Sequence, residues 1–329
     1  MRAGTGCGAS ARRSRWAAAA LLAATGLRAA EPAPAAAPAD SAALFELGRQ
    51  LFEQLPEAVK AQYDFPTRAE WDAKFAKIQQ VLAGDSLGEL AALAPEARQG
   101  LAMLRLLPEY EDLAAWLEQR LDEIEAAQAI TAPRPPSPPA PPLRPDAPRP
   151  AVPYQPVPHY QAWLERVRNR PPPARAAQLL PVLRAAFAAE GVPVELVWLA
   201  EAESSFNPAA RSPVGAKGLF QFMPDTAKAM GLATFLPDER TDPAKSARAA
   251  ARYLRALHGR FGNWALALAA YNAGEGRVSR LLAAKGAQSF TAIAETLPAE
   301  TRMYVPKVCA LIATRAGVPP ERIAPPRKK

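Results

Sequence analysis

Apolar residues recur at helical spacing along residues 42–130, with polar residues between them. Three such patterns each predict an amphipathic helix with one buried face, so we interpret this stretch as a helical module. Thr67 and Glu70 have the spacing of a capping box, which predicts that the middle helix begins just after Thr67. The patterned positions are Leu44, Leu47 and Leu51; Trp71, Phe75, Ile78 and Leu82; and Leu113, Trp116, Leu117, Leu121 and Ile124.

A second helical region is predicted for residues 159–316. Residues 194–203 predict a largely buried helix, and residues 264–271 are almost wholly apolar and predict a central one. Asp242 followed by Pro243 indicates a helix start, because an N-cap acid and a proline in the first turn both favour that position. No long stretch alternates between apolar and polar residues as a strand would. The sequence therefore predicts an all-α class, with at most a minor hairpin in a glycine-containing loop.

Prolines separate the two helical regions. Of the 36 prolines in the chain, 13 fall within residues 131–158. Such a segment cannot build a helix or a sheet and favours an extended geometry of about 3.1 Å per residue. We therefore expect a linker there and a separate helical module on its N-terminal side. Residues 31–41 are expected to form a shorter tether, and residues 317–329 a basic tail.

The first 30 residues have the features of an export signal. Four arginines precede an apolar run at residues 16–27, which is too short to span a bilayer comfortably, and small residues follow. We expect export to the periplasm or cell envelope, with membrane association only if this segment stays uncleaved. Cys7 would be removed with the signal, and the remaining Cys309 alone cannot form an internal disulfide.

The charge of the chain says less about its partners than its motifs do. A net charge of +8 over 329 residues attracts polyanions. No zinc-finger spacing, RNA-binding aromatic signature or dense basic patch is present, so nucleic acid is not expected as a partner. His159 and His258 are far apart and cysteines are few, so a metal cluster lacks ligands. We expect no metal and no cofactor.

Glu203 is the leading candidate for a chemical role. It closes the apolar run 194–203 and precedes a polar, glycine-containing loop. Burial against apolar neighbours raises the pKa of a carboxyl group, which suits it to donate a proton near neutral pH. Glu201 is the alternative acid. Two residues on a helix are about 200° apart, so the two carboxylates are expected to face opposite ways.

Further polar groups follow Glu203 along the chain. They offer hydroxyl, amide, phenol and carboxylate groups that suit sugar hydroxyls and acetamido groups. Taken singly, each is also a common feature of a helical core. The candidates are Ser212 and Gln221 around the 215–218 loop, Tyr271 and Asn272 at the end of an apolar helix, and Glu300 with Tyr304.

Four motifs in this order carry a resemblance to a known family. They read ESSFNP at 203–208, SPVGAKGLFQFMP at 212–224, ALAAYNAGEGRV at 267–278 and ETRMYV at 300–305. Over about residues 175–315 the chain resembles the catalytic domain of soluble and membrane-bound lytic murein transglycosylases, above all their D type. The resemblance does not extend to residues 42–130.

The resemblance implies a lysozyme-like helical fold, with minimal strand content, in which Glu203 is the only catalytic acid. On the family pattern Glu203 protonates the bridging oxygen between N-acetylmuramic acid and N-acetylglucosamine. It then takes the proton from the muramic 6-hydroxyl, and a 1,6-anhydro sugar results. Ser212, Gln221 and Met223 match positions that line the sugar subsites, and Tyr271 matches the phenol near the acid. Glu300 and Tyr304 match positions in the last of the four motifs.

Two other functions remain open at this point. A lysozyme-like muramidase would hydrolyse the same bond, and a retaining hydrolase needs a second carboxylate about 5 Å from the acid. A non-catalytic peptidoglycan-binding scaffold would use the same groups without chemistry. The expected partner is the glycan strand of peptidoglycan, and residues 42–130 could dock to a cell-wall or envelope protein. The carboxylates available for a hydrolase are Asp225, Asp238, Glu239 and Glu300.

Overall fold

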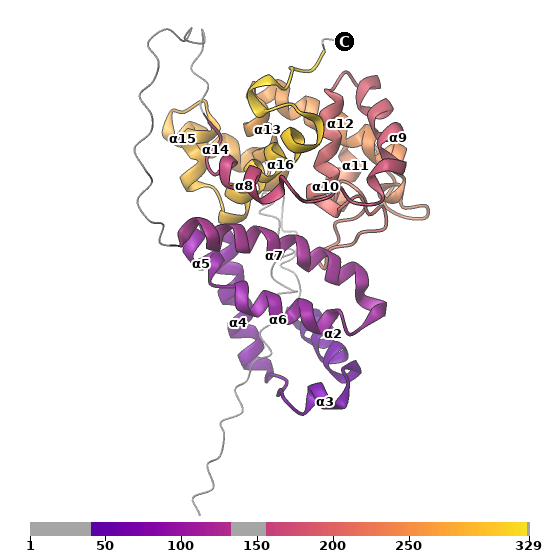
Figure 1. Ribbon diagram of the computed structural model, residues 1–329, viewed down its shortest axis with the longest axis vertical. Helices are drawn as coiled ribbons and strands as arrows, with labels where there is room; N and C mark the ends of the chain where they lie inside the picture. The colour runs from indigo at the N-terminus through magenta and orange to yellow at the C-terminus, as the bar shows by residue number, and fades with distance from the viewer. Residues whose placement is uncertain (1–40, 133–155, 328–329) are drawn as a thin grey trace, which may run out of the picture.

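The computed structural model describes residues 41–132 and 156–327, and within them the chain is almost wholly helical (Figure 1). β-Structure in these two ranges consists of isolated bridges, such as Arg211 with Lys217 and Lys217 with Phe222. The predicted all-α class is therefore confirmed, and the glycine-containing loop forms bridges rather than a regular hairpin. The signal segment 1–30, nearly all of the tether and most of the linker predicted from the sequence lie outside the described residues.

The helices before the linker form around a small aromatic cluster. Phe45 and Phe65 pack against Trp71, with ring centroids 5.6 and 6.2 Å from the indole. The predicted capping box is confirmed, because Glu70 N donates to the Thr67 hydroxyl and Thr67 N donates to the Glu70 carboxylate. The elements are α2 Ser41–Gln54, α3 Glu57–Lys60, α4 Arg68–Ala83, α5 Leu87–Ala91, α6 Ala94–Leu104, the 3-10 helix η1 Pro108–Tyr110 and α7 Glu111–Thr131.

The helices after the linker follow most of the predicted starts. Asp242 caps α12 by accepting from Lys245 N at 2.8 Å, with Pro243 at the first helical position. The apolar run at 264–271 lies in a buried helix. The elements are α8 Tyr160–Val167, α9 Ala176–Ala189, η2 Val194–Trp198, α10 Leu199–Ser204, α11 Pro224–Ala229, η3 Glu239–Thr241, α12 Pro243–Phe261, α13 Trp264–Ala273, α14 Glu275–Lys285, α15 Phe290–Ile293, η4 Ala294–Thr296, α16 Ala299–Ala316 and η5 Pro320–Arg322.

Residues 194–203 differ from the single helix that the sequence predicts. The segment begins as a 3-10 helix, η2, and becomes α-helical only at Leu199. Leu196 to Ala200 are five consecutive buried apolar residues, and such a run has no polar face whose periodicity would distinguish three from 3.6 residues per turn. The change of pitch matters because it sets the direction in which α10 presents Glu203.

Helix α16 is the centre of the molecule. Every residue from Ala299 to Ile312 is buried, and the helix packs against α8, α10 and α13. It also contacts α4, α5 and α7, which come from the other side of the linker. Neither α16 nor any other helix in residues 41–132 and 156–327 has the length and apolar character needed to cross a membrane.

The structure does not show the separate N-terminal module that the linker suggested. Ala299 N donates to Gly84 O at 2.9 Å, and Arg120 of α7 pairs with Glu300 of α16 at 2.6 Å. Buried apolar residues from both sides of the linker belong to one continuous cluster. In Figure 1, α7 runs directly beneath the helices that follow the linker. A proline-rich sequence predicts an extended connection, but it carries no information about whether the connected parts touch.

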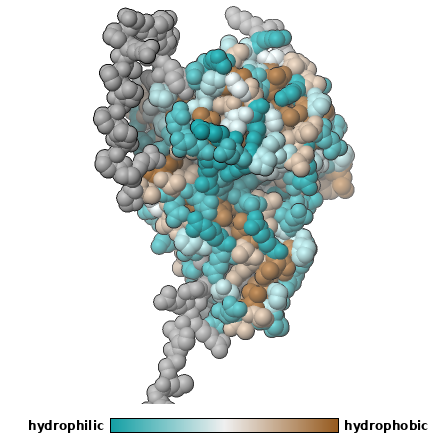
Figure 2. Space-filling model, viewed as in Figure 1, coloured by the Kyte–Doolittle hydropathy of each residue, from teal (hydrophilic) through white to brown (hydrophobic). Residues whose placement is uncertain are grey.

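Paired charges fill much of this contact. A cavity of about 620 Å³ lies between α7 and the later helices. The charged residues that line it include Asp122, Arg166, Arg170 and Lys307. Burial alone would raise the pKa of Asp122, but the hydrogen bond from Arg170 and the charges of Lys307, Arg170 and Arg166 hold it well below its usual range. Hydrophilic residues accordingly spread over the band where α7 meets the later helices (Figure 2).

Candidate functional site

Glu203 lies in the last turn of α10 and is almost completely buried, with 2% of its surface exposed. Its Oε1 accepts a hydrogen bond from the hydroxyl of Tyr304 on α16, with 2.6 Å between the two oxygens. The local sequence explains the burial, since Glu203 ends an apolar segment that packs on α16. The structure therefore joins the first and the last of the four motifs through one short hydrogen bond.

Glu201 has separate partners, as the helical spacing predicted. Its carboxylate accepts two hydrogen bonds from Arg315, at 2.7 and 2.9 Å. The pair is buried, with 6% and 7% of the two side chains exposed. A carboxylate held in this bidentate way is fixed in one orientation. Its contacts tie α10 to α16, whereas the carboxylate of Glu203 is bound by Tyr304.

The chain reverses directly after α10. Ser205 and Phe206 have φ values of 49° and 58°, in the left-handed region that non-glycine residues seldom occupy. Phe206 N donates to Ala200 O at 3.2 Å, which closes the end of the helix, and the Phe206 ring packs edge-on against Trp198 at 5.4 Å. This reversal exposes the end of α10 to the loop that follows.

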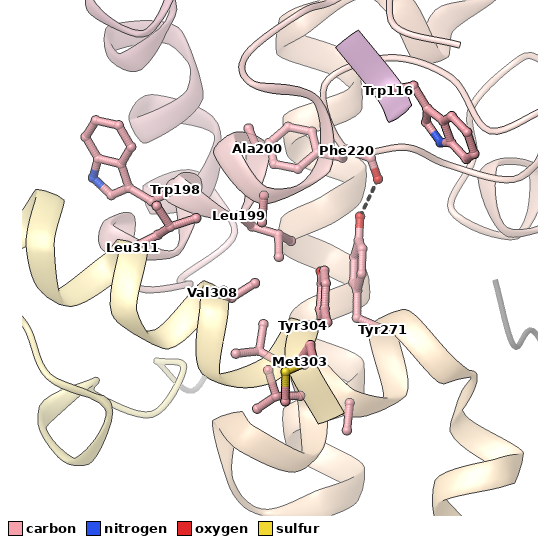
Figure 3. Packing of buried hydrophobic residues seen from close by; sticks show 14 of the residues in the cluster. Trp116, Trp198, Leu199, Ala200, Phe220, Tyr271, Met303, Tyr304, Val308 and Leu311 are labelled. Atoms are coloured by element: carbon pink, nitrogen blue, oxygen red, sulfur yellow. Dashed lines mark hydrogen bonds between the residues drawn. The ribbon is translucent and has the colours of Figure 1, made fainter. Parts of the chain in front are cut away.

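Two side chains hold the backbone of that loop next to Glu203. The Ser204 hydroxyl donates to Leu219 O at 2.9 Å, and the Tyr271 hydroxyl donates to Phe220 O at 2.8 Å. Figure 3 shows the rings of Tyr271 and Tyr304 next to each other, with their hydroxyl ends pointing the same way. The phenol of Tyr271 thus fixes the loop, while that of Tyr304 reaches the acid.

Arg240 clamps the same loop from the other side. Its guanidinium donates to Gly215 O at 2.7 Å and to Phe222 O at 3.1 Å. Asp238 orients Arg240, and its hydrogen bonds from Arg240 and Lys217 hold the pKa of Asp238 well below its usual range. Gly218 has φ 78°, and a Cβ there would lie 1.8 Å from Arg240 O. The close approach of these two backbones therefore requires glycine.

The predicted sugar-binding residues of the loop have local roles in this structure. The Ser212 hydroxyl accepts from Ala216 N at 2.9 Å, and the Gln221 amide donates to Gly218 O at 2.9 Å. Met223 is half-buried at the N-cap of α11. The hydrogen bonds of Ser212 and Gln221 therefore hold the shape of the 212–224 loop.

The remaining predicted site residues lie where α13 and α16 meet. Asn272 accepts from the Thr301 hydroxyl at 2.8 Å. Glu300 lies one turn before Tyr304 on α16, and its carboxylate faces Arg120 of α7. These contacts join the helices that support Glu203 and Tyr304.

Sequence reasoning missed three residues of this arrangement. Arg240 follows Asp238 by two positions, but no pattern indicates which backbone a lone arginine will clamp. Gln119 and Arg120 lie on α7, more than 80 positions before Ser205 and Glu300, which they contact. For Arg120 the available signal is that a charged residue falls within the apolar stripe of an amphipathic helix, which indicates a buried partner.

Comparison with known proteins places the central part of this arrangement in one domain family. Residues 182–293 match the family model described as "Transglycosylase SLT domain". The match includes α10, the 212–224 loop and α13, and it ends before α16 begins.

Curated relatives match a similar share of the chain. Membrane-bound lytic murein transglycosylase D of Escherichia coli K12 is 41% identical over 124 residues, which is 36% of this chain and 27% of that protein. Soluble lytic murein transglycosylase of Salmonella typhimurium LT2 is 40% identical over 120 residues, which is 34% of this chain and 19% of that protein. The chain thus spans about a quarter or less of these two relatives. The 70 kDa soluble lytic transglycosylase SLT70 of Escherichia coli aligns at 22% identity with a TM-score of 0.40, covering 94% of this chain and 47% of that one.

Proposed function

We propose, starting from the transglycosylase SLT domain that residues 182–293 carry, that the chain is a peptidoglycan lytic transglycosylase. It would cleave the bond from N-acetylmuramic acid to N-acetylglucosamine and leave 1,6-anhydromuramic acid ends. The names of the two relatives support murein as the substrate. The observation that carries the proposal is the buried carboxylate of Glu203, in short hydrogen-bond contact with Tyr304.

In this mechanism Glu203 acts twice. As the acid it donates its proton to the glycosidic oxygen, so that the leaving sugar departs as an alcohol. As the base it then removes the proton from the muramic 6-hydroxyl, whose oxygen forms a bond to the anomeric carbon of the same sugar. Atoms balance without water, and Glu203 ends in its protonated form. The Tyr304 hydroxyl holds the carboxyl in one orientation through both steps.

The other carboxylates that the sequence offered support a reaction without a second acidic residue. A retaining hydrolase needs a nucleophilic carboxylate about 5 Å from the acid. Asp238 is bound by Lys217 and Arg240, and Glu239 is bound by Lys245 at 2.5 Å. Of the other two candidate carboxylates, Glu300 faces Arg120 and Asp225 is exposed in the first turn of α11.

We further propose the setting in which the enzyme works. The residues that bind and cleave the glycan would lie within residues 159–316, with the 212–224 loop, which includes Met223, and Asn272 contributing to glycan binding. The basic net charge and the signal-like first 30 residues fit action on the wall in the periplasm or cell envelope. Within residues 42–130, α7 would support α10 and α16 through the contacts described above, and an envelope protein would be the further partner of this region.

Analysis of the products of peptidoglycan digestion tests the proposed reaction. Purified sacculi are incubated with the full chain, and the released muropeptides are separated and weighed by mass spectrometry. We expect ends that are one water lighter than the corresponding hydrolysed (reducing) ends, which identifies the anhydro sugar. Products with hydrated ends would instead identify a muramidase, and binding to sacculi without release would identify a scaffold. A parallel digest with Glu203→Gln protein controls for a contaminating enzyme.

Replacing Tyr304 by phenylalanine separates the hydroxyl from the ring. We expect the turnover of Tyr304→Phe to fall roughly tenfold to hundredfold, because a hydrogen bond to the carboxylate that forms when Glu203 gives up its proton contributes about 1.5–3 kcal/mol. The buried ring keeps its packing, so the melting temperature should change little. Muropeptide release over time measures the effect, and Tyr160→Phe on α8 is the control. Wild-type turnover in Tyr304→Phe would remove this hydroxyl from the mechanism.

A further inference from the structure

Helix α7 lies outside the matched domain, yet it contacts the residues that surround Glu203. It precedes residue 182 by more than 50 positions and runs beneath α10 and α16 in Figure 1. Its contacts reach both helices that form the acid's environment. They join Asp112 to Asn207 at 3.0 Å, Gln119 to the turn after α10, Arg120 to Glu300 at 2.6 Å and Glu123 to Lys307 at 3.0 Å.

The turn after α10 needs such support. Ser205 and Phe206 are consecutive residues in the left-handed region. Each such residue costs about 1–3 kcal/mol and persists only where its surroundings hold it. The turn begins two residues after Glu203, so a relaxed turn would change the direction of the last helical turn and of the carboxylate. Glu203 therefore depends on whatever stabilises Ser205.

Gln119 makes the contacts that this turn requires. In the orientation of its amide that satisfies all of these neighbours, the Gln119 nitrogen donates to the backbone carbonyl of Glu203 at 3.0 Å; in the opposite orientation it donates to Ser205 Oγ at 2.9 Å. In the first orientation the amide oxygen accepts from Ser205 N at 2.7 Å and from Ser205 Oγ at 2.9 Å. One side chain thus satisfies a carbonyl at the helix end and also binds the first strained residue. This is the arrangement of a C-terminal cap supplied from another part of the chain.

The same position is tied to the helix that carries Tyr304. Lys307 of α16 donates to the backbone carbonyl of Gln119 at 3.4 Å and to the Glu123 carboxylate at 3.0 Å. Lys307 lies three residues after Tyr304 on that helix. The backbone of residue 119 therefore fixes α16, while its side chain fixes α10. Displacement of α7 would move the acid and its phenol partner relative to each other.

We infer that Gln119 is a positioning residue for Glu203, and that α7 is part of the catalytic unit although it lies outside the SLT domain. This inference rests on the proposed role of Glu203 as the catalytic acid. Gln119 acts through the backbone of residues 203–205 and does not take part in the chemistry. Misplacing a reacting group by about 1 Å can cost about a hundredfold in rate, so loss of a cap at this position is expected to appear in kcat.

The test compares three variants of the full chain. Gln119→Met keeps the length and volume of the side chain but removes both hydrogen-bonding groups. Gln119→Glu keeps the acceptor for Ser205 and loses the donor to the Glu203 carbonyl. Gln128→Met is the matched control, because Gln128 lies on the same helix and its side chain bonds Arg98 of α6. We measure kcat and KM on glycan strands of defined length, and hydrogen exchange of peptides that cover residues 199–207.

We expect kcat of Gln119→Met to fall about tenfold with KM within twofold, and exchange in 199–207 to rise by a similar factor. Gln119→Glu should fall between Gln119→Met and wild type, and Gln128→Met should match wild type in both measurements. Wild-type kcat and exchange in Gln119→Met would overturn the inference. So would a rise in KM with unchanged exchange, which would make Gln119 a substrate contact. If wild-type protein cleaves no glycan, the proposed function fails, and the exchange measurement alone decides whether Gln119 holds the turn.

Discussion

Glu203→Gln is expected to lower the release of muropeptides by at least about a thousandfold. General acid–base catalysis contributes about 10²–10⁴ to a rate, and in the proposed mechanism one residue supplies both proton transfers. Glutamine has nearly the same shape, and its amide oxygen can still accept the hydrogen bond from Tyr304. The fold and the affinity for sacculi should therefore be retained. Muropeptide chromatography measures activity, and co-sedimentation with sacculi measures binding.

Glu195→Gln provides the matched control for this substitution. Glu195 belongs to the 3-10 helix that leads into α10, so it carries the same chemical change in the same segment. We expect wild-type turnover from it. Substantial turnover in Glu203→Gln protein would mean that another group donates the proton, and Glu203 would then have only the structural role of binding Tyr304.

Arg120→Met is expected to destabilise the protein by about 3–5 kcal/mol, because removing one member of a buried ion pair leaves a buried charge uncompensated. Arg120 is 9% exposed, and its guanidinium lies 2.6 Å from Glu300 and 3.0 Å from Glu123. Both carboxylates are themselves buried. Chemical denaturation followed by circular dichroism measures the change. Arg120→Lys keeps the charge and should lose less stability, so it provides a folded comparison if Arg120→Met does not fold.

An exposed ion pair nearby provides the control for the contribution of burial to the stability effect. Arg105 and Glu118 are 2.7 Å apart, with 58% and 60% of their side chains exposed. Arg105→Met should cost less than about 1 kcal/mol, as is usual for surface pairs. Equal stability of Arg105→Met and Arg120→Met would contradict the view that the buried pair fastens α7 to α16.

Local signals in the sequence predicted the helices well, because each depends on neighbouring residues. The capping box at Thr67 and the start at Asp242 are set by side chains three residues from the groups that they bind. The opposite orientations of Glu201 and Glu203 follow from helical geometry alone. These features need no knowledge of the rest of the molecule.

The contacts between distant segments were not predictable in the same way. Arg120 and Glu300 are 180 positions apart, and no periodicity relates them. The composition of the 131–158 segment predicted separation, whereas packing between α7 and α16 is decided by the surfaces on either side of it. Gln119 gave no signal, because a half-buried glutamine on an amphipathic helix is an ordinary residue until the turn at Ser205 is placed against it.

The central position of α16 has a consequence for how the chain acquires its structure during synthesis. Helices α4, α5, α7, α8, α10 and α13 all pack on a helix that is translated after them. Their contacts with it close long loops, which is a slow step compared with forming the helices themselves. A growing chain therefore holds Glu203 before it holds Tyr304. We expect such a chain to lack the assembled site until the residues of α16 have emerged and packed, which delays activity to the last stage of folding.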